Sequence, residues 1–488
     1  MSSLHQTIAD RLFRAPDHVV VGAFETASAL TARELVHLIM ELGAGPLAGT
    51  KRIGVLSNQR PEAIIAVLGC FFAGATFVPL NPKFPKERLR KVARLAGVEL
   101  ILCDQTTSDL AEDFGLASVD ISKLRREAFP AAEPQTRLSV PDTSQPAYMM
   151  FTSGTTGDPK GVSISHKNLA SYVAGITSLI DFPCGARFSQ LFDLSFDLAM
   201  HDIFVCFATG GTLVMPTALD LMMPAAYVRK KKIDVWFSVP ALAASAGKSP
   251  GKEGDHTLSL ALFCGEMLPR DYARSVMTLC APDAEIWNLY GPTEATIAFT
   301  AHRFDEAFDT APDVPIGHGF GANQTALLES DGTVNEAPDP GSEGELLLAG
   351  PQVFGGYEPQ HASPFLSVNG TSYYRTGDRV SVSPKGYHFR QRMDDQLKVR
   401  GFRVEAAEIE AACRAHLSMD EVAAIVAGDE SQTHIIAFYT GGDSKPEPTP
   451  LEAYLPDYMI PRAFHRLEKM PRNANGKTDR KALKGLLS

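Results

Sequence analysis

The chain carries the segment FTSGTTGDPKG at residues 151–161, and this segment decides how its fold and function are interpreted. It follows an apolar run at 147–150 and precedes a helix that we expect to begin near Ser165. Glycine lets the backbone adopt positive φ and approach a ligand closely, while backbone amides, hydroxyls and a lysine favour an anion. The spacing differs from that of a Walker P-loop, so an ordinary Gly/Ser/Thr-rich turn is the alternative. We predict a loop that binds phosphate through the residues Thr152, Ser153, Gly154, Thr155, Thr156, Gly157 and Lys160.

Length and composition narrow the class of protein. The chain has 488 residues, 44% of them hydrophobic, which predicts two or more well-filled domains. A net charge of -11 argues against a nucleic-acid or anionic-membrane surface as the main binding site. The seven cysteines show neither CxxC pairs nor a zinc-ligand spacing, which favours a reducing cytoplasm. No N-terminal signal pattern and no apolar run of about 20 residues is present, so we expect no membrane span.

The N-terminal third of the chain alternates helix and strand patterns. Thr31 and Glu34 have the capping-box spacing, and apolar residues then recur on one helical face as far as Gly43. Strands are expected at 52–57, 76–80 and 98–104, with helices at 61–74 and 85–97 between them. This alternation predicts a parallel sheet with helices on its faces. The polar residues 105–145 are expected to form an irregular surface connection.

The C-terminal part of the chain has a different sequence pattern. The glycine-rich region 343–374 has the pattern of β-hairpins, and a charged turn at Asp394 precedes a helix at 405–416 and strands at 422–427 and 435–440. We predict a large N-terminal domain, residues 1–393, of layered α/β subdomains with a β-rich part. Residues 394–488 are predicted to form a small α+β domain, with Asp394 at the joint. The fold class is therefore α/β plus α+β.

Five motifs in order resemble those of the AMP-forming adenylate ligase superfamily, which comprises acyl-CoA synthetases, luciferases and the adenylation domains of nonribosomal peptide synthetases. They are FTSGTTGDPKG at 151–161, NLYGPTEAT at 288–296, YRTGDR at 374–379, RMDDQLKVRGFRVEAAEIE at 392–410 and NANGKTDRKAL at 473–483. Stand-alone amino-acid adenylation enzymes, D-alanine:carrier-protein ligases especially, look most similar at VPLNP (78–82), FDLAMHDIF (196–204), FCGEMLP (263–269) and YMIP (458–461). The chain departs from the superfamily at Ala32 and Gln391, where an aromatic residue and a glycine are usual, and from the D-alanine ligases at His201, where they usually carry an apolar residue.

The resemblance implies that a substrate carboxylate attacks the α-phosphorus of ATP, giving an acyl adenylate and pyrophosphate, before transfer to a thiol. Catalysis of this kind rests on positioning and electrostatics. The implied sites are residues 152–160 for the β and γ phosphates, Asn288, Tyr290 and Gly291 for adenine, Thr293 for the α-phosphate, Glu294 for Mg²⁺, Asp378 and Arg392 for ribose, and Lys477 as a mobile catalytic lysine. The small domain is implied to rotate about Asp394 between the two half-reactions.

These residues also have plainer interpretations. Lys160 and Lys477 resemble solvated surface lysines, and Glu294 resembles an acid at a helix N-terminus. Tyr290 is equally a buried aromatic residue, and Asp378 equally a β-turn residue. The order of the motifs is what favours the functional interpretation.

Asp197 discriminates between substrate classes. By resemblance it matches the aspartate that pairs with the α-amino group in amino-acid adenylating enzymes, whereas fatty-acyl and acetyl ligases have no use for a buried acid there. The plainer alternative is an Asp197 that is hydrogen-bonded to a nearby loop amide. The other pocket residues implied by the resemblance are Leu198, His201, Ser238, Leu262, Cys264, Leu289, Ile297 and Ala298. Because none carries a fixed charge, we expect a small or medium aliphatic amino acid, with alanine or proline first; His201 is equally well a core residue.

The expected acceptor of the acyl group is the phosphopantetheine thiol of a small carrier protein. Carrier proteins are typically acidic, and the end of this chain is rich in lysine and arginine. One alternative is an acyl-CoA synthetase that releases a free CoA thioester. Another is a non-catalytic sensor of nucleotides or amino acids, against which the presence of Lys477, Glu294 and Asp378 counts.

Overall fold

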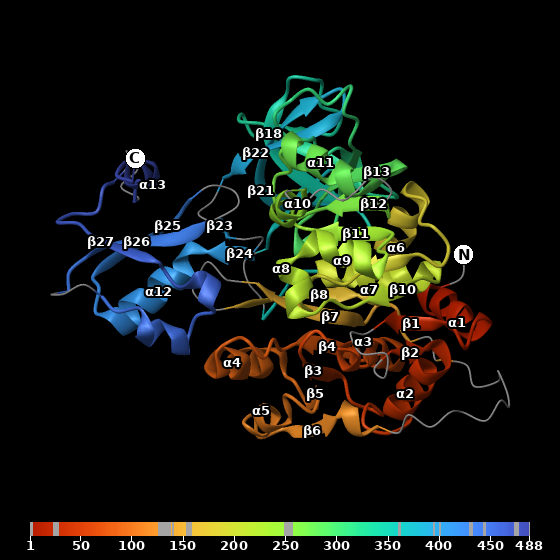
Figure 1. The fold of residues 1–488 in the computed structure, drawn as a ribbon. Coiled ribbons are helices and arrows are strands. Elements are labelled where there is room, and N and C mark those ends of the chain that lie inside the picture. The colour runs from red at the N-terminus through yellow and green to blue at the C-terminus, as the bar shows by residue number, and fades with distance from the viewer. Residues whose placement is uncertain are drawn as a thin grey trace. The chain divides into compact units, whose positions relative to one another are not determined.

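The structure is a computed structural model (Figure 1). It describes residues 3–22, 29–124, 138, 141–152, 159–247, 257–359, 363–393, 396–399, 402–428, 433–442, 446–472 and 478–487. The chain divides into two compact units, of which the first comprises residues 1–82, 96–150 and 162–391. The second comprises residues 83–95, 151–161 and 392–488.

A nine-stranded sheet forms the centre of the first unit. Its strands in spatial order are β15 (His318–Gly319), β14 (Thr300–Arg303), β13 (Cys280–Tyr290), β12 (Leu258–Phe263), β11 (Val235–Ser238), β9 (Arg187–Ser189), β10 (Thr212–Val214), β1 (Val19–Gly22) and β2 (Leu30–Thr31). The strands from β13 to β1 run parallel to one another; β14 and β2 pair antiparallel with β13 and β1, and β15 pairs antiparallel with β14. Every residue of β10 and β11 is buried, as is usual for a parallel strand packed on both faces.

Seven helices accompany this sheet in the described part of the chain. They are α1 (Leu4–Arg14), α6 (His166–Leu179), α7 (Leu198–Thr209), α8 (Ala218–Met222), α9 (Pro224–Lys231), α10 (Pro240–Gly247) and α11 (Arg270–Val276). α7 contacts both α1 and α6, and α10 contacts α11. α7 is almost wholly buried and, apart from His201, Asp202 and Thr209, consists of apolar residues, which is the pattern of a central helix.

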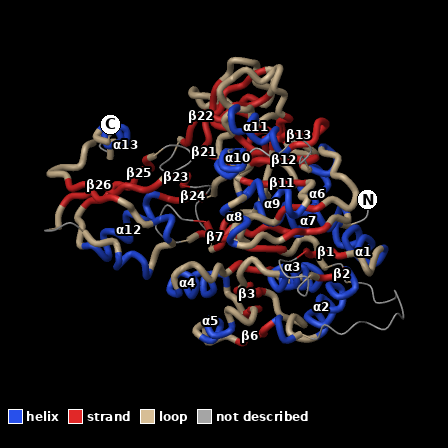
Figure 2. Tube along the Cα trace, viewed as in Figure 1, coloured by secondary structure: helices blue, strands red, loops and turns tan. Residues whose placement is uncertain are grey.

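A second, seven-stranded sheet contains the strands predicted near the N-terminus. Its spatial order is β19 (Tyr357–Glu358), β8 (Lys160–Ser165), β7 (Pro146–Thr152), β4 (Thr76–Pro79), β3 (Arg52–Leu56), β5 (Leu100–Cys103) and β6 (Ala117–Asp120). The helices that precede or separate these strands along the chain are α2 (Ala32–Ala44), α3 (Pro61–Ala73), α4 (Lys86–Ala96) and α5 (Ser108–Glu112), of which α4 belongs to the second unit as far as Leu95. The predicted alternation of strands and helices is confirmed, and blue helices and red strands follow one another through this part of Figure 2.

One expectation for this sheet is wrong. Residues 105–145 are not wholly irregular, because they contain α5 and the edge strand β6. β6 pairs in parallel with β5 from Leu100 to Cys103, yet none of its own residues is fully buried. An edge strand without a buried face carries no alternating apolar pattern, so the sequence gives no signal for it.

The β-rich part of the first unit is a six-stranded antiparallel sheet. It consists of β17 (Val334–Asn335), β16 (Gln324–Leu328), β18 (Glu343–Ala349), β21 (Thr371–Ser383) and β20 (Phe365–Val368), with β22 (Gly386–Arg392) also paired to β21. The hairpins predicted for residues 343–374 are therefore confirmed.

The second unit has a small α+β core in its C-terminal part. Its elements are β23 (Gln396–Val399), β24 (Phe402–Glu405), α12 (Ala406–Leu417), β25 (Glu421–Ala427), β26 (His434–Thr440), β27 (Ala463–Arg466) and α13 (Arg480–Gly485). The predicted helix and both predicted strands form, and β27 adds a parallel strand beside β26. Among the helices that the structure describes, none has the length and apolar character needed to cross a membrane.

Candidate active site

Three neighbouring parallel strands place predicted residues at one edge of the nine-stranded sheet. Ser238 ends β11 and pairs with Phe263, the last residue of β12, which pairs in turn with Asn288 in β13. Cys264 and Leu289 directly follow these positions, and both are buried. The carboxyl ends of parallel strands are where open α/β sheets bind ligands. The other predicted wall residues are also buried: Leu198, Leu262, Ile297 and Ala298.

Asp197 lies immediately before α7 and is buried. Its side chain does not cap the helix; instead Oδ2 accepts the Ile297 N–H at 3.3 Å, and the carboxyl shares a hydrogen bond with the Thr293 side chain. Burial raises the pKa of Asp197 to about 7, and the neighbouring Glu294 carboxylate also raises it. The loop amide that we considered as an alternative partner is present, but neither its long hydrogen bond nor the hydroxyl of Thr293 brings a positive charge to the buried carboxyl. A cationic group on a ligand would stabilise the carboxylate.

His201 lies one turn further along α7 and is fully buried. Its Nδ1 is hydrogen-bonded to the Tyr172 hydroxyl at 2.6 Å, and its ring lies 4.4 Å from that of Phe237 and 6.0 Å from that of Phe182. Burial lowers the pKa of His201 to about 3, so the imidazole is neutral. Its Nε2 has no hydrogen-bond partner among the described residues. The His201 ring thus packs against aromatic side chains, and its Nε2 remains without a hydrogen-bond partner among the described residues.

Glu294 is fully buried in the turn after β13 and is held by a residue that the sequence did not single out. Tyr357, in β19, donates a hydrogen bond to Glu294 Oε1 at 2.6 Å. A carboxylate fixed at a rigid turn is a suitable ligand for a hard cation such as Mg²⁺. The glutamate therefore fits the predicted metal site.

The residues predicted for adenosine come together at the end of β13. Tyr290 Oη donates to Asp378 Oδ2 at 2.5 Å. The Asn288 amide nitrogen donates to two backbone carbonyls, while its buried Oδ1 has no partner in the part of the chain that the structure describes. Such an acceptor can receive an amino group of a ligand. A Cβ on Gly291 would lie 2.7 Å from Ala298 Cα, so only glycine fits this reversal of the chain.

The positions predicted for the phosphate loop, the joint and a catalytic lysine fall within the residue ranges of the second unit. Thr152 ends β7, and its buried hydroxyl has no hydrogen-bond partner among the described residues. Lys160 begins β8, and Arg392 ends β22. The remaining residues predicted there lie outside the described ranges: Ser153, Gly154, Thr155, Thr156, Gly157, Asp394 and Lys477.

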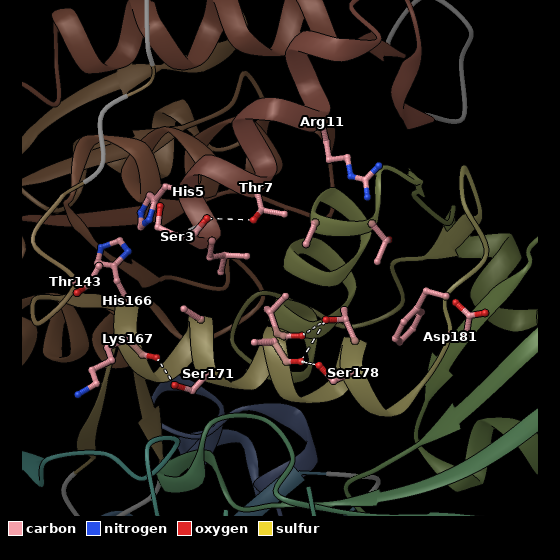
Figure 3. A pocket seen from close by; sticks show the side chains of 18 of the residues that line it. Ser3, His5, Thr7, Arg11, Thr143, His166, Lys167, Ser171, Ser178 and Asp181 are labelled. Carbon is pink, nitrogen blue, oxygen red and sulfur yellow. Dashed lines mark hydrogen bonds between the residues drawn. The ribbon is translucent and has the colours of Figure 1, made fainter. Parts of the chain in front are cut away.

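A separate groove lies elsewhere in the first unit (Figure 3). It has a volume of 680 Å³ and lies between α1 and α6, with His5, His166, Arg11 and Asp181 among its lining residues. Burial lowers the pKa of His5 to about 4 and that of His166 to about 3, so both rings are neutral at pH 7. None of the predicted site residues that the structure describes lines this groove. It is therefore not the candidate active site.

Comparison with known proteins places the chain in a family. Residues 9–358 match the AMP-binding enzyme family, and the chain belongs to it. The predicted membership of the adenylate-forming ligases is thereby confirmed.

Particular relatives are also similar to this chain. It is 32% identical over 459 residues to a D-alanine--D-alanyl carrier protein ligase of Bacillus licheniformis, with 90% of each chain covered. It superimposes with a TM-score of 0.87 at 26% identity on the Vibrio cholerae adenylation domain AlmE in complex with glycyl-adenosine-5'-phosphate, covering 99% of this chain and 97% of that one. Holo-PA1221, an NRPS protein containing adenylation and PCP domains, gives 0.84 at 25% identity, covering 99% and 84%.

Proposed function

We propose that this protein adenylates a small aliphatic amino acid with ATP and transfers the aminoacyl group to the phosphopantetheine thiol of a carrier protein. The observation that carries the proposal is the buried Asp197 carboxyl, which accompanies predicted pocket residues that are buried and carry no fixed charge. A buried carboxylate needs a cationic or hydrogen-bonding partner, and the α-ammonium group of an amino acid supplies one. A fatty or acetyl substrate does not.

In the first half-reaction, Asp197 would hold the ammonium group so that the substrate carboxylate faces the α-phosphorus of ATP. A bond forms between the carboxylate oxygen and phosphorus, and the bond from phosphorus to the pyrophosphate oxygen breaks. Thr293 would donate to the α-phosphate, and Lys477 would offset the charges of both anions. Mg²⁺, when bound to Glu294, would neutralise the phosphate oxygens.

The nucleoside of ATP would be held by residues at the end of β13 and in β21. Asn288 and Tyr290 would contact adenine, the tyrosine through its ring face. The Asp378 carboxylate, already positioned by the Tyr290 hydroxyl, can accept both ribose hydroxyls. Arg392 is proposed at the same ribose, and the loop from Thr152 to Lys160 at the β and γ phosphates.

Alanine is the leading substrate, followed by proline. The wall residues Leu198, Leu262, Leu289 and Ile297 are apolar and buried, which favours a short aliphatic side chain. The relatives support this choice, because one group is named for D-alanine and AlmE is in complex with a glycyl adenylate. A carrier protein as the acceptor is supported by the same ligases and by holo-PA1221, which contains a PCP domain.

The test is ATP/pyrophosphate exchange with L- and D-amino acids and simple carboxylic acids. This assay reports the first half-reaction and needs no acceptor. We expect one small aliphatic amino acid to exceed the rest. Faster exchange with fatty or aryl acids would contradict the proposal, and transfer to free CoA rather than to a loaded carrier protein would make the chain an acyl-CoA synthetase.

The pH dependence of amino-acid capture should reflect Asp197. Since only the carboxylate attracts the ammonium group, kcat/KM for exchange is expected to rise with pH and level off above the Asp197 pKa of about 7.

The stability of the protein should depend on the same carboxyl. The pKa of Asp197 in the folded protein lies above the ordinary value of 3.8, so ionisation of this group should lower the free energy of unfolding as pH rises from about 4 to 7. Asp197→Asn should abolish that part of the stability profile; an unchanged profile would show that Asp197 ionises normally.

A further inference from the structure

The turn that follows β13 carries proposed site residues in a strained conformation. Thr296 and Ile297 have φ values of 57° and 70°, and the Ala298 N–H donates to the Thr296 carbonyl at 2.9 Å. A three-residue turn of this kind, with positive φ at its centre, is the rare and strained form of the γ-turn. A β-branched residue such as Ile297 is especially unfavourable there. The surrounding structure must therefore hold the turn in place.

Gln352, in the loop after β18, supplies this restraint. Its side chain is buried, and Nε2 donates to the Ala298 carbonyl at 2.7 Å. The same nitrogen lies within 3.3 Å and 3.4 Å of the Ala295 and Thr296 carbonyl oxygens. In return, Thr296 Oγ1 donates to the Gln352 backbone carbonyl at 2.5 Å. One amide thus faces carbonyl groups on both sides of Ile297.

The Gln352 amide is itself fixed by its neighbours. Asn323 Nδ2 donates to Gln352 Oε1 at 2.8 Å, which requires Nε2 to face the turn. The carbonyl groups on either side of Gln352 accept hydrogen bonds from Asn168 Nδ2 at 2.7 Å and 3.1 Å. The Phe354 N–H donates to the Glu294 carbonyl at 2.8 Å. Residues 351–354 therefore brace the turn at several points.

We propose that Gln352 is a positioning residue for substrate selection, which holds the strained turn so that the Ile297 N–H points at the Asp197 carboxylate. The inference rests on the proposed function, because it assumes that Asp197 pairs with the substrate ammonium group. Ile297 donates to Asp197 at 3.3 Å, and Thr293, from the same turn, also bonds to it. Without the Gln352 side chain the turn relaxes, and the Asp197 carboxylate loses both its position and its hydrogen bonds.

The test uses Gln352→Met, which keeps side-chain length and removes both polar atoms. We expect KM for the amino acid to rise about tenfold and KM for ATP to rise by a smaller factor, because the lost hydrogen bond to the Ala298 carbonyl lies next to Ile297, which bonds Asp197, whereas the Phe354 N–H still holds Glu294. The pH at which exchange levels off should also rise. In an Asp197→Ala background the same substitution should have no further effect on amino-acid KM, since a shared pathway makes the effects non-additive.

Tyr387→Phe is the matched control. It removes a part-buried hydrogen bond, to Thr325 at 3.1 Å, in the β-rich part of the same unit, and leaves the hydrogen bonds between Gln352 and the turn in place. Equal rises in both KM values, additivity with Asp197→Ala, or an effect no larger than that of Tyr387→Phe would overturn the inference. If Gln352→Met does not fold, Asn323→Ala, which frees the Gln352 amide, must show a smaller shift in the same direction. Pyrophosphate exchange by the wild type with an amino acid is the test of the proposed function itself. If the wild type is active in that assay, a negative result with these variants counts against the role of Gln352 alone.

Discussion

Replacing Asp197 by alanine is expected to reduce the preference for an amino acid over its deamino analogue by about a hundred- to a few-thousandfold. The expected loss corresponds to about 3–5 kcal/mol, the usual cost of breaking a buried ion pair. Measuring kcat/KM for pyrophosphate exchange with both substrates isolates the effect, because the two differ only in the amine. The free energy of unfolding should not fall, since the substitution removes a carboxyl whose burial is costly in the free protein.

Asp202 offers a matched control for this prediction. Like Asp197 it is buried, but it lies within α7; burial raises its pKa well above the ordinary value, and the Leu191 backbone donates a hydrogen bond to it. Asp202→Asn should leave the substrate preference unchanged. Equal losses in the two variants would mean that α7 and the residue before it need these buried acids for structure. An unchanged preference in Asp197→Ala would show that the substrate amine lies elsewhere.

Local patterns in the sequence predict most of the elements. The capping box at Thr31 and Glu34 forms, and α3 begins at Pro61 and ends before Gly74, which adopts the left-handed conformation. These signals act within a few residues and depend little on the rest of the chain. The order of strands in a sheet has no such local signal. The three-residue strand β9 lies between β10 and β11, a placement decided by packing between distant segments.

The candidate site is predictable only where a motif marks it. The sequence singles out Tyr290, Asp378 and Glu294, and the structure joins the first two by a hydrogen bond. The sequence has no motif that marks Tyr357 or Gln352, because their contacts with the turn after β13 arise from tertiary packing. A tyrosine and a glutamine in a glycine-rich loop look like surface residues until their partners are known. Residues that support a site are therefore harder to predict than those that face the ligand.

Replacing Lys477 by alanine is expected to slow adenylation by about a hundred- to a thousandfold while leaving transfer from a preformed adenylate intact. Adenylation brings the negative charges of the substrate carboxylate and the α-phosphate together, and one preorganised donor of charge typically contributes an effect of this size. We propose that transfer to a thiol uses another face of the predicted small domain, residues 394–488, after rotation about Asp394. Pyrophosphate exchange measures the first step, and release of AMP from added aminoacyl adenylate and carrier protein measures the second.

Lys484 provides the comparison that makes the Lys477 result specific. It is an exposed lysine in α13, a few residues further along the same basic stretch, so Lys484→Ala removes an equal charge from the surface. Because exposed charges are screened by water and salt, both half-reactions should keep nearly their wild-type rates in this variant. A Lys477→Ala enzyme that loses both steps equally would argue against rotation, since one lysine would then serve both reactions from a single arrangement. Loss of transfer in Lys484→Ala would instead place this stretch at the carrier-protein surface.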